Sequence, residues 1–177
     1  MTSKLELVLG EINVTTEKIG AALGLPSVGK SFPEERTSEQ EGLIAPFKSV
    51  NKTKLKEILA SKDCNVSTSK GRDHFRRAFI MFLVDSFLAP TSCSVTSPKH
   101  LPTIVDVQNI TIYNWARTIH DFLIKGIKKF KTDNTLSIDG CLFVLMRIVT
   151  LLVEQCVIGA KFSRKSIKKE RAKEGAT

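Results

Sequence analysis

One short stretch of the sequence carries the residue types of a phosphate-binding loop. Residues 24–31 read Gly-Leu-Pro-Ser-Val-Gly-Lys-Ser and match the GxxxxGKS pattern. In such a loop the backbone N–H groups surround the phosphates, the Lys pairs with them and the Ser hydroxyl holds a magnesium ion. The spacing from Gly24 to Ser31 therefore raises the hypothesis of a phosphate- or nucleotide-binding protein.

The residues around this pattern argue against that function. A phosphate-binding loop follows a buried strand and opens a long helix. Here a capped helix is expected before Gly24, and Pro33 follows the Ser by two residues. Pro26 also removes one backbone donor from the loop. We regard the pattern as a chance match and keep nucleotide binding as the alternative hypothesis.

The other residues that could do chemistry are scattered. The four cysteines form no CxxC pair, and buried thiols are expected; they are Cys64, Cys93, Cys141 and Cys156. His120 and Asp121 lie beside an apolar helical face, but no second His or Cys follows four residues later. The sequence predicts no catalytic residues, no cofactor and no metal site, and so favours a non-enzymatic protein.

Positive charge is concentrated at the end of the chain. The net charge is +9, and residues 161–177 contribute +5 of it, because seven basic residues there outnumber Glu170 and Glu174. The basic residues are Lys161, Arg164, Lys165, Lys168, Lys169, Arg171 and Lys173. Such clusters are typical of nuclear-localisation signals and of weak, sequence-independent nucleic-acid binding, although a solvated helix end would look the same. With no apolar signal-peptide run near Met1, we expect an intracellular, nuclear protein.

The periodicity of the first part of the chain predicts short elements. Alternation over Lys4–Val14 predicts a short β-hairpin. Thr15 or Thr16 should then cap a short helix that ends at Gly24. Residues 27–46 contain Pro and Gly residues and a charged run, so we expect an exposed loop there.

Four later segments show a helical period or a strongly apolar composition. Residues 51–61 predict an amphipathic helix, and residues 71–89 a longer one whose aromatic stripe should face the core. That stripe consists of Phe75, Phe79, Phe82, Leu83, Ser86 and Phe87. A further helical face consists of Ile112, Trp115, Ile119, Phe122, Leu123, Ile127 and Phe130, with Trp115 as a core anchor.

The most apolar segment is residues 137–156. Arg147 and Glu154 interrupt it, which disfavours a membrane span, so we expect no membrane association and a buried central helix capped by Ser137. The length of 177 residues and the globular composition suit one domain. We therefore predict an all-α, mainly helical domain over residues 1–160, with an N-terminal hairpin, followed by a basic tail over residues 161–177.

Four separated segments together resemble a known plant family. They are ELVLGEINVTTEKIGAALGLPSVGKSFPE at residues 6–34, HFRRAFIMFLVDSFLAPTS at 74–92, YNWARTIHDFLIKGI at 113–127 and LSIDGCLFVLMRIVTLL at 136–152. Their order and spacing, over Lys4–Glu154, resemble the plant mobile domain, also labelled aminotransferase-like. That family is related to regions that accompany SUMO-protease-like domains in plant transposon proteins.

The resemblance implies a largely helical domain without established catalytic residues. It also implies a transposon-derived origin and a nuclear role in transposon silencing or genome maintenance, with a protein partner that the sequence does not identify. The chain differs from longer family members because little sequence precedes Gly24 and no SUMO-protease domain is present. It resembles a truncated or domesticated copy.

Overall fold

The computed structural model describes residues 3–7, 10–133 and 137–154. At the N-terminus, strands β1 (Ser3–Leu7) and β2 (Gly10–Val14) pair antiparallel, with Ser3 opposite Val14. The predicted hairpin is confirmed. The buried Val14 side chain connects β2 to the helical core.

Helix α1 (Thr16–Leu23) follows the hairpin directly. The Thr15 hydroxyl accepts a hydrogen bond from the Lys18 backbone N–H at 3.3 Å, which caps the first turn. Gly24, at φ 67°, ends the helix in the left-handed conformation that glycine adopts most easily. Both boundaries agree with the prediction from sequence.

The loop expected over residues 27–46 is wrong in its second half. Helix α2 (Ser38–Ile44) forms there and is followed by a 3₁₀ turn, η1 (Ala45–Phe47). Thr37 and Gln40 make a capping box, in which each side chain accepts a hydrogen bond from the other's backbone N–H. Ile44 and Phe47 are fully buried. Capping and burial therefore outweigh the Pro and Gly content that suggested a loop.

The next helices pack against each other. Helix α3 (Lys52–Ala60) is capped by Asn51, and helix α4 (Ser69–Leu83) by Thr68. After Leu83 the helix widens into a π-helical turn, η3 (Val84–Leu88). The short 3₁₀ segments are η2 (Lys62–Cys64), η4 (Pro98–Ile104) and η5 (Ile110–Ile112).

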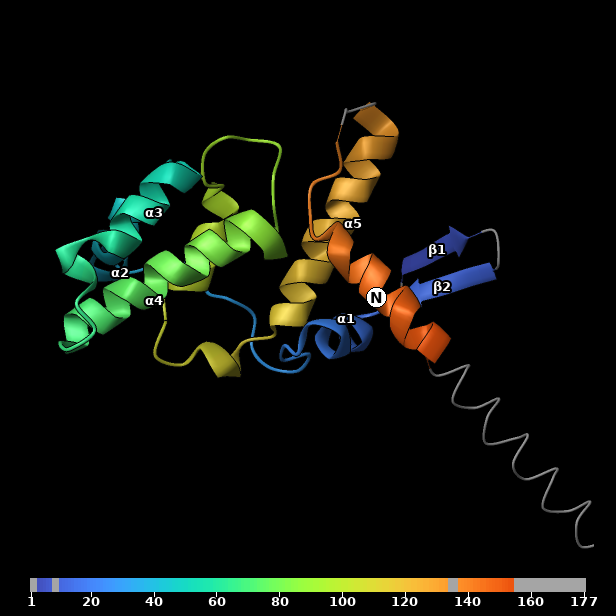
Figure 1. Ribbon diagram of the computed structural model, residues 1–177, viewed down its shortest axis with the longest axis horizontal. Helices are drawn as coiled ribbons and strands as arrows, with labels where there is room; N and C mark the ends of the chain where they lie inside the picture. The colour runs from blue at the N-terminus through green and yellow to red at the C-terminus, as the bar shows by residue number, and fades with distance from the viewer. Residues whose placement is uncertain (1–2, 8–9, 134–136, 155–177) are drawn as a thin grey trace, which may run out of the picture.

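Helix α5 (Trp115–Asp133) is the longest helix among the described elements. It packs on α1, while α4 packs on α3 and on η4. Figure 1 shows α2, α3 and α4 grouped on one side, and α1, α5 and the hairpin on the other. One contiguous cluster of buried side chains runs through both groups, so the prediction of a single, mainly helical domain is confirmed.

The prediction of a buried central helix over residues 137–156 is confirmed only in part. Within the described part of that segment, the helix covers residues 142–154 and starts well after Ser137. Gly140, at φ 110°, packs so closely on α5 that an added Cβ would lie 2.8 Å from the Leu123 Cα. This irregular stretch delays the start of the helix, which then buries Val144 and Ile148 in the core but leaves Leu142, Phe143 and Met146 exposed. No helix within the described ranges is long and apolar enough to cross a membrane.

Candidate functional site

The Gly24–Ser31 stretch is hydrogen-bonded to the residues just before α5 and does not form a phosphate-binding loop. Its backbone groups already have partners: the Lys30 N–H donates to the Ile112 carbonyl at 2.9 Å, and the Lys30 carbonyl accepts from the Asn114 N–H at 2.9 Å. The Asn114 side chain donates to the Ser27 carbonyl at 2.8 Å. No helix begins at Lys30, so no set of free N–H groups converges on a phosphate.

Gly29 has a structural reason for being glycine. Its φ is 138°, and a Cβ there would lie 2.3 Å from the Ile112 carbonyl oxygen. The close approach of this backbone to Ile112 therefore needs a residue without a side chain. Gly24 ends α1, and Gly29 allows the close approach of the backbone at Ile112. Both glycines therefore have a structural role that does not require a bound nucleotide.

The basic tail, with all the side chains predicted for nuclear import or nucleic-acid contact, lies outside the described residues. Of the four cysteines, Cys64, Cys93 and Cys141 are described, and Cys156 lies outside the described residues. Cys64 and Cys141 are buried, and burial raises the pKa of both thiols, as expected for core cysteines. Cys93 is exposed, contrary to the expectation. Within the described ranges, no group of three His, Cys, Asp or Glu side chains could hold a metal ion.

Trp115 is a core residue, as predicted. It is 7% exposed, and its indole N–H donates to the Ile110 carbonyl at 2.8 Å. Phe32 packs edge-on against it and stacks on Tyr113. The two ends of the predicted face behave differently, because Ile112 and Phe130 are exposed. At the start of α5, Trp115 therefore contributes to the core and not to a binding surface.

The aromatic stripe of α4 faces solvent to a degree that the sequence analysis did not expect. Phe79 is 48% exposed and Phe87 39%, whereas Ala78, Met81 and Val84 fill the core. Phe75, Phe82 and Leu83 are half-buried. The prediction that this stripe is core is therefore wrong. A second apolar stripe with the same helical period, formed by Ala78, Met81 and Val84, has smaller side chains and faces the interior instead.

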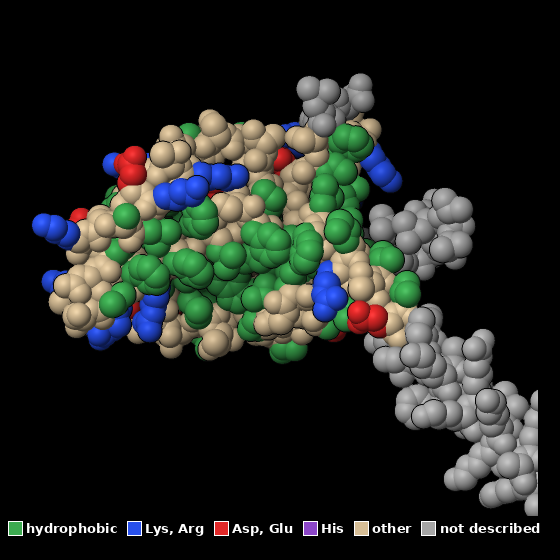
Figure 2. Space-filling view, in the orientation of Figure 1, with side chains coloured by type: hydrophobic (Ala, Val, Ile, Leu, Met, Phe, Trp, Pro, Cys, Tyr) green, Lys and Arg blue, Asp and Glu red, His purple; other side chains and the backbone are tan. Residues whose placement is uncertain are grey.

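The exposed stripe continues onto residues 142–154. The rings of Phe87 and Phe143 lie 5.5 Å apart, and those of Phe75 and Phe79 6.0 Å apart. Phe143 is 46% exposed and Met146 65%. We call this surface the apolar band; it consists of Phe75, Phe79, Phe82, Leu83, Phe87, Leu142, Phe143 and Met146. Figure 2 shows hydrophobic side chains running across the molecule over these elements.

Basic side chains border the apolar band. The Lys56 ammonium lies 6.0 Å from the centre of the Phe82 ring. On α4, Arg72 precedes Phe75 by one turn and Arg76 precedes Phe79 by one turn, and Arg147 follows Phe143 by one turn. The carboxylate of Asp73 is already engaged by Arg76 at 3.2 Å and by the amide of Gln108 at 2.6 Å. In Figure 2, Lys and Arg side chains are visible along the margins of the band.

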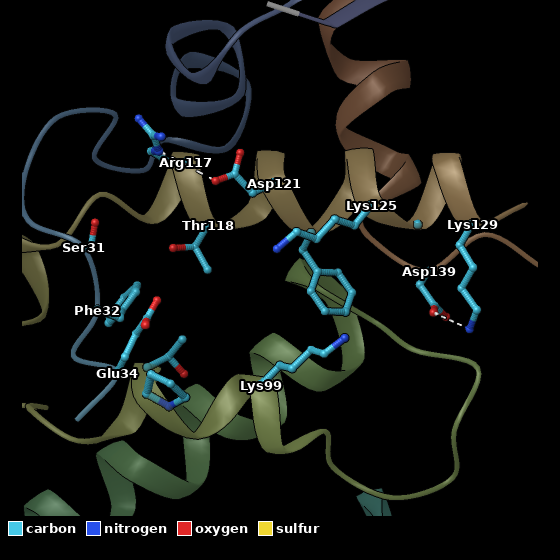
Figure 3. Close-up of a pocket in the computed structure, with 14 residues that line it drawn as sticks. Ser31, Phe32, Glu34, Lys99, Arg117, Thr118, Asp121, Lys125, Lys129 and Asp139 are labelled. Carbon is cyan, nitrogen blue, oxygen red and sulfur yellow. Dashed lines mark ion pairs between the residues drawn. The ribbon is translucent and has the colours of Figure 1, made fainter. Parts of the chain in front are cut away.

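A pocket of about 460 Å³ lies elsewhere, between α5, η4 and the chain after Ser31. These three segments and Asp139 supply its polar lining (Figure 3): Ser31, Glu34, Lys99, Thr103, Arg117, Thr118, Asp121, Lys125, Lys129 and Asp139. Phe32, Pro102 and Phe122 supply its apolar wall. A cavity of this size is within the range for small-molecule sites. Of the GxxxxGKS residues, only Ser31 lines this pocket.

A buried ionisable pair lies behind this pocket. The Asp85 carboxylate, in η3, and the His100 imidazole, in η4, are 3.5 Å apart, and both side chains are almost completely buried. The His100 ring also packs on the Phe122 ring, with centroids 5.2 Å apart. Neither ring nitrogen of His100 makes a hydrogen bond with the described residues. The pair connects the π-helical turn to the segment that carries Lys99.

No curated protein and no solved structure matches the chain. One family model does match, over residues 1–146, from the N-terminal hairpin into the helix that completes the apolar band. Since this covers well over half of the chain, the protein belongs to the family described as a domain of unknown function (DUF8566).

Proposed function

We propose that the protein is a non-enzymatic interaction protein that binds a partner protein through the apolar band. The observation that carries the proposal is the exposure of adjoining large side chains, above all Phe79, Phe87, Phe143 and Met146. Scattered exposed apolar residues are normal, but a contiguous patch of aromatic residues marks interaction surfaces. Aromatic and Met side chains are also enriched where proteins bind each other.

The arrangement of the band fits a helical partner segment. Phe75, Phe79 and Phe87 are spaced along α4 and η3, and Phe143 adds a second row from the adjacent helix. A surface of this kind accepts the apolar side of an amphipathic helix, which inserts anchors at positions i, i+3 or i+4, and i+7. Met146, which is unbranched and polarisable, can adapt to the shape of such anchors.

Charge selects among the candidate occupants. Lys56, Arg72 and Arg147 around the band favour a partner with Asp and Glu beside its apolar side. A second copy of this chain would bring the same positive margin, and residues 161–177 carry seven basic residues. Both would be repelled. We therefore propose an amphipathic, acid-flanked helix of another protein as the occupant.

The cellular setting is also a proposal. The resemblance of four segments to the plant mobile domain supports a transposon-derived origin and a role in nuclear silencing or genome maintenance. The basic residues between Lys161 and Lys173 support a nuclear location.

The proposal can be tested with designed helical peptides and isotope-labelled protein. One peptide carries Leu anchors flanked by Glu, and its matched control carries the same anchors flanked by Lys. We expect the Glu-flanked peptide to shift NMR signals of the apolar band and to bind at least about tenfold more tightly than the Lys-flanked one. Met146→Glu and Phe79→Glu should remove binding. Val28→Glu, at a residue 82% exposed outside the band, should not.

Two results would contradict the proposal. The first is equal binding of the two peptides, which would remove the charge argument. The second is binding that survives Met146→Glu and Phe79→Glu in folded protein, which would place the interaction elsewhere. Sedimentation of the free protein tests the second copy as occupant: a dimer dispersed by Met146→Glu would replace the proposed partner with the chain itself.

A further inference from the structure

Two lysines of the pocket have no charged partner. Lys125 reaches into it from α5 and Lys99 from η4, and Figure 3 shows both side chains extending into the same space. Within the described residues neither ammonium group makes an ion pair. Two like charges in one concave site repel each other unless an anion lies between them. The arrangement therefore suits an anionic ligand.

The acidic residues of the pocket do not neutralise these lysines. Both oxygens of Asp121 are engaged, one by His120 Nδ1 at 3.0 Å and one by Arg117 Nε at 3.7 Å. Asp139 accepts from the Ser92 N–H at 2.9 Å and lies 3.9 Å from the Lys129 ammonium.

Glu34 is the exception among the acidic residues. Its carboxylate makes no ion pair or hydrogen bond with the described residues, and Figure 3 shows it on the side of the pocket near Phe32. A carboxylate accepts hydrogen bonds from hydroxyl groups. The pocket thus presents positive charge from Lys99 and Lys125 and a hydrogen-bond acceptor at Glu34. A ligand that satisfies both must carry an anionic group and, a short distance away, hydroxyl donors.

The rest of the lining fits the body of such a ligand. Phe32 and Phe122 offer apolar surface for the carbon skeleton of a sugar or the face of a base. The Thr118 hydroxyl, which donates to the Asn114 carbonyl at 3.4 Å, and the Ser31 hydroxyl offer further polar contacts. The volume of about 460 Å³ leaves room for a ring and a phosphate.

We propose that this pocket binds a small phosphorylated polyol, such as a sugar phosphate or a nucleoside monophosphate. Lys99 and Lys125 hold its phosphate, Glu34 accepts hydrogen bonds from its hydroxyl groups, and Phe122 packs against its ring. The site differs from the GxxxxGKS hypothesis, because its cations come from η4 and α5 and Lys30 is not part of the lining. It also shares no residue with the apolar band, so it does not depend on the proposed partner.

Calorimetry and NMR with ribose 5-phosphate, AMP, adenosine and inorganic phosphate test the proposal on the full chain. We expect ribose 5-phosphate and AMP to bind and to shift signals of α5 and η4, and adenosine to bind at least about tenfold more weakly than AMP. The Lys99→Gln/Lys125→Gln double variant should weaken ribose 5-phosphate binding by about 10- to 100-fold. The matched control is Lys128→Gln, an exposed residue of α5 outside the lining, which should leave affinity unchanged.

Glu34→Gln separates recognition of the polyol from simple attraction of an anion. The loss of its negative charge should strengthen the binding of inorganic phosphate. The loss of a charged acceptor should weaken the binding of ribose 5-phosphate. The proposal is overturned if neither phosphate ester binds at millimolar concentration. It is also overturned if Lys128→Gln weakens binding as much as the double variant, or if Glu34→Gln strengthens both probes equally.

Discussion

At the scale of single residues, the Asp85–His100 pair holds two segments together inside the protein. Removing one member leaves the other polar side chain buried without a partner, which costs about 1–3 kcal/mol for a buried polar group. We therefore expect Asp85→Leu and His100→Leu each to lower the free energy of unfolding markedly. In the double variant both polar groups are replaced by apolar ones, and the loss should be smaller than the sum of the two.

Urea unfolding of the wild type and the three variants measures this coupling. A coupling energy of about 1 kcal/mol or more would agree with a direct interaction between the side chains. Strict additivity would contradict it. Each folded variant should also show unchanged near-ultraviolet circular dichroism, since Trp115 lies on another helix.

Trp115 and Ile112 give a second comparison between single residues. Both belong to one apolar face in the sequence, but Trp115 is buried and Ile112 is 41% exposed. Trp115→Ala should destabilise the domain by about 3–5 kcal/mol, the range for a large aromatic residue in a core. Ile112→Ala should cost well under half of that. Chemical denaturation measures both, and comparable losses would show that exposure does not separate the two positions.

At the scale of elements, two glycines should respond to alanine with opposite signs. Gly29 has a φ of 138° and lies against the Ile112 carbonyl, so Gly29→Ala should cost about 1–3 kcal/mol. Gly42 lies within α2, with open space around the position of a Cβ. Gly42→Ala should stabilise the protein by about 0.5–1 kcal/mol, because alanine loses less backbone entropy in a helix. Thermal unfolding distinguishes the signs, and stabilisation by Gly29→Ala would refute the close approach.

The packing of α4 against its neighbours explains why its larger aromatic residues face outward. The helix has two apolar stripes, and its neighbours α3 and η4 leave room for Ala78, Met81 and Val84. The stability of a close-packed interface depends on the shape of the side chains as well as on their hydrophobicity. Small side chains also allow two helices to approach each other more closely. The bulky Phe79 and Phe87 are left at the margin, where they cost stability unless a partner covers them.

At the scale of the whole molecule, the charge distribution leads to a prediction about the tail. Deleting residues 161–177 removes seven basic residues but only Phe162 and Ile167 as large apolar groups. The melting temperature of the domain should therefore change little, while nuclear accumulation of a chain fused to a large fluorescent protein should fall. Any weak nucleic-acid binding should fall with it, along with its salt dependence.

Imaging of the full-length and truncated fusions measures the effect. A matched control replaces four basic residues outside the tail, Lys52, Lys54, Lys128 and Lys131, with Gln, which lowers charge without altering the tail. That control should keep the nuclear signal. Equal nuclear signal in the full-length and truncated chains would show that the tail does not direct localisation.

The sequence by itself determined the elements whose causes are local. The alternation before Val14, the cap at Thr15 and the helical periods over residues 51–61 and around Trp115 all act within a few residues, and the structure confirms the elements they predict. The capping box at Thr37 was readable in the same way, although the prolines and glycines near it suggested a loop.

Only the tertiary structure decided which apolar surfaces are buried and which polar side chains meet. The Phe79 stripe and the Met146 helix are as hydrophobic as the core, and their exposure depends on which neighbours fold against them. Lys99 and Lys125 belong to separate segments, and the packing of η4 near α5 brings them into one pocket. Hydrophobicity is a property of each residue, but burial is set by contacts between residues far apart in the chain, which a local pattern does not contain.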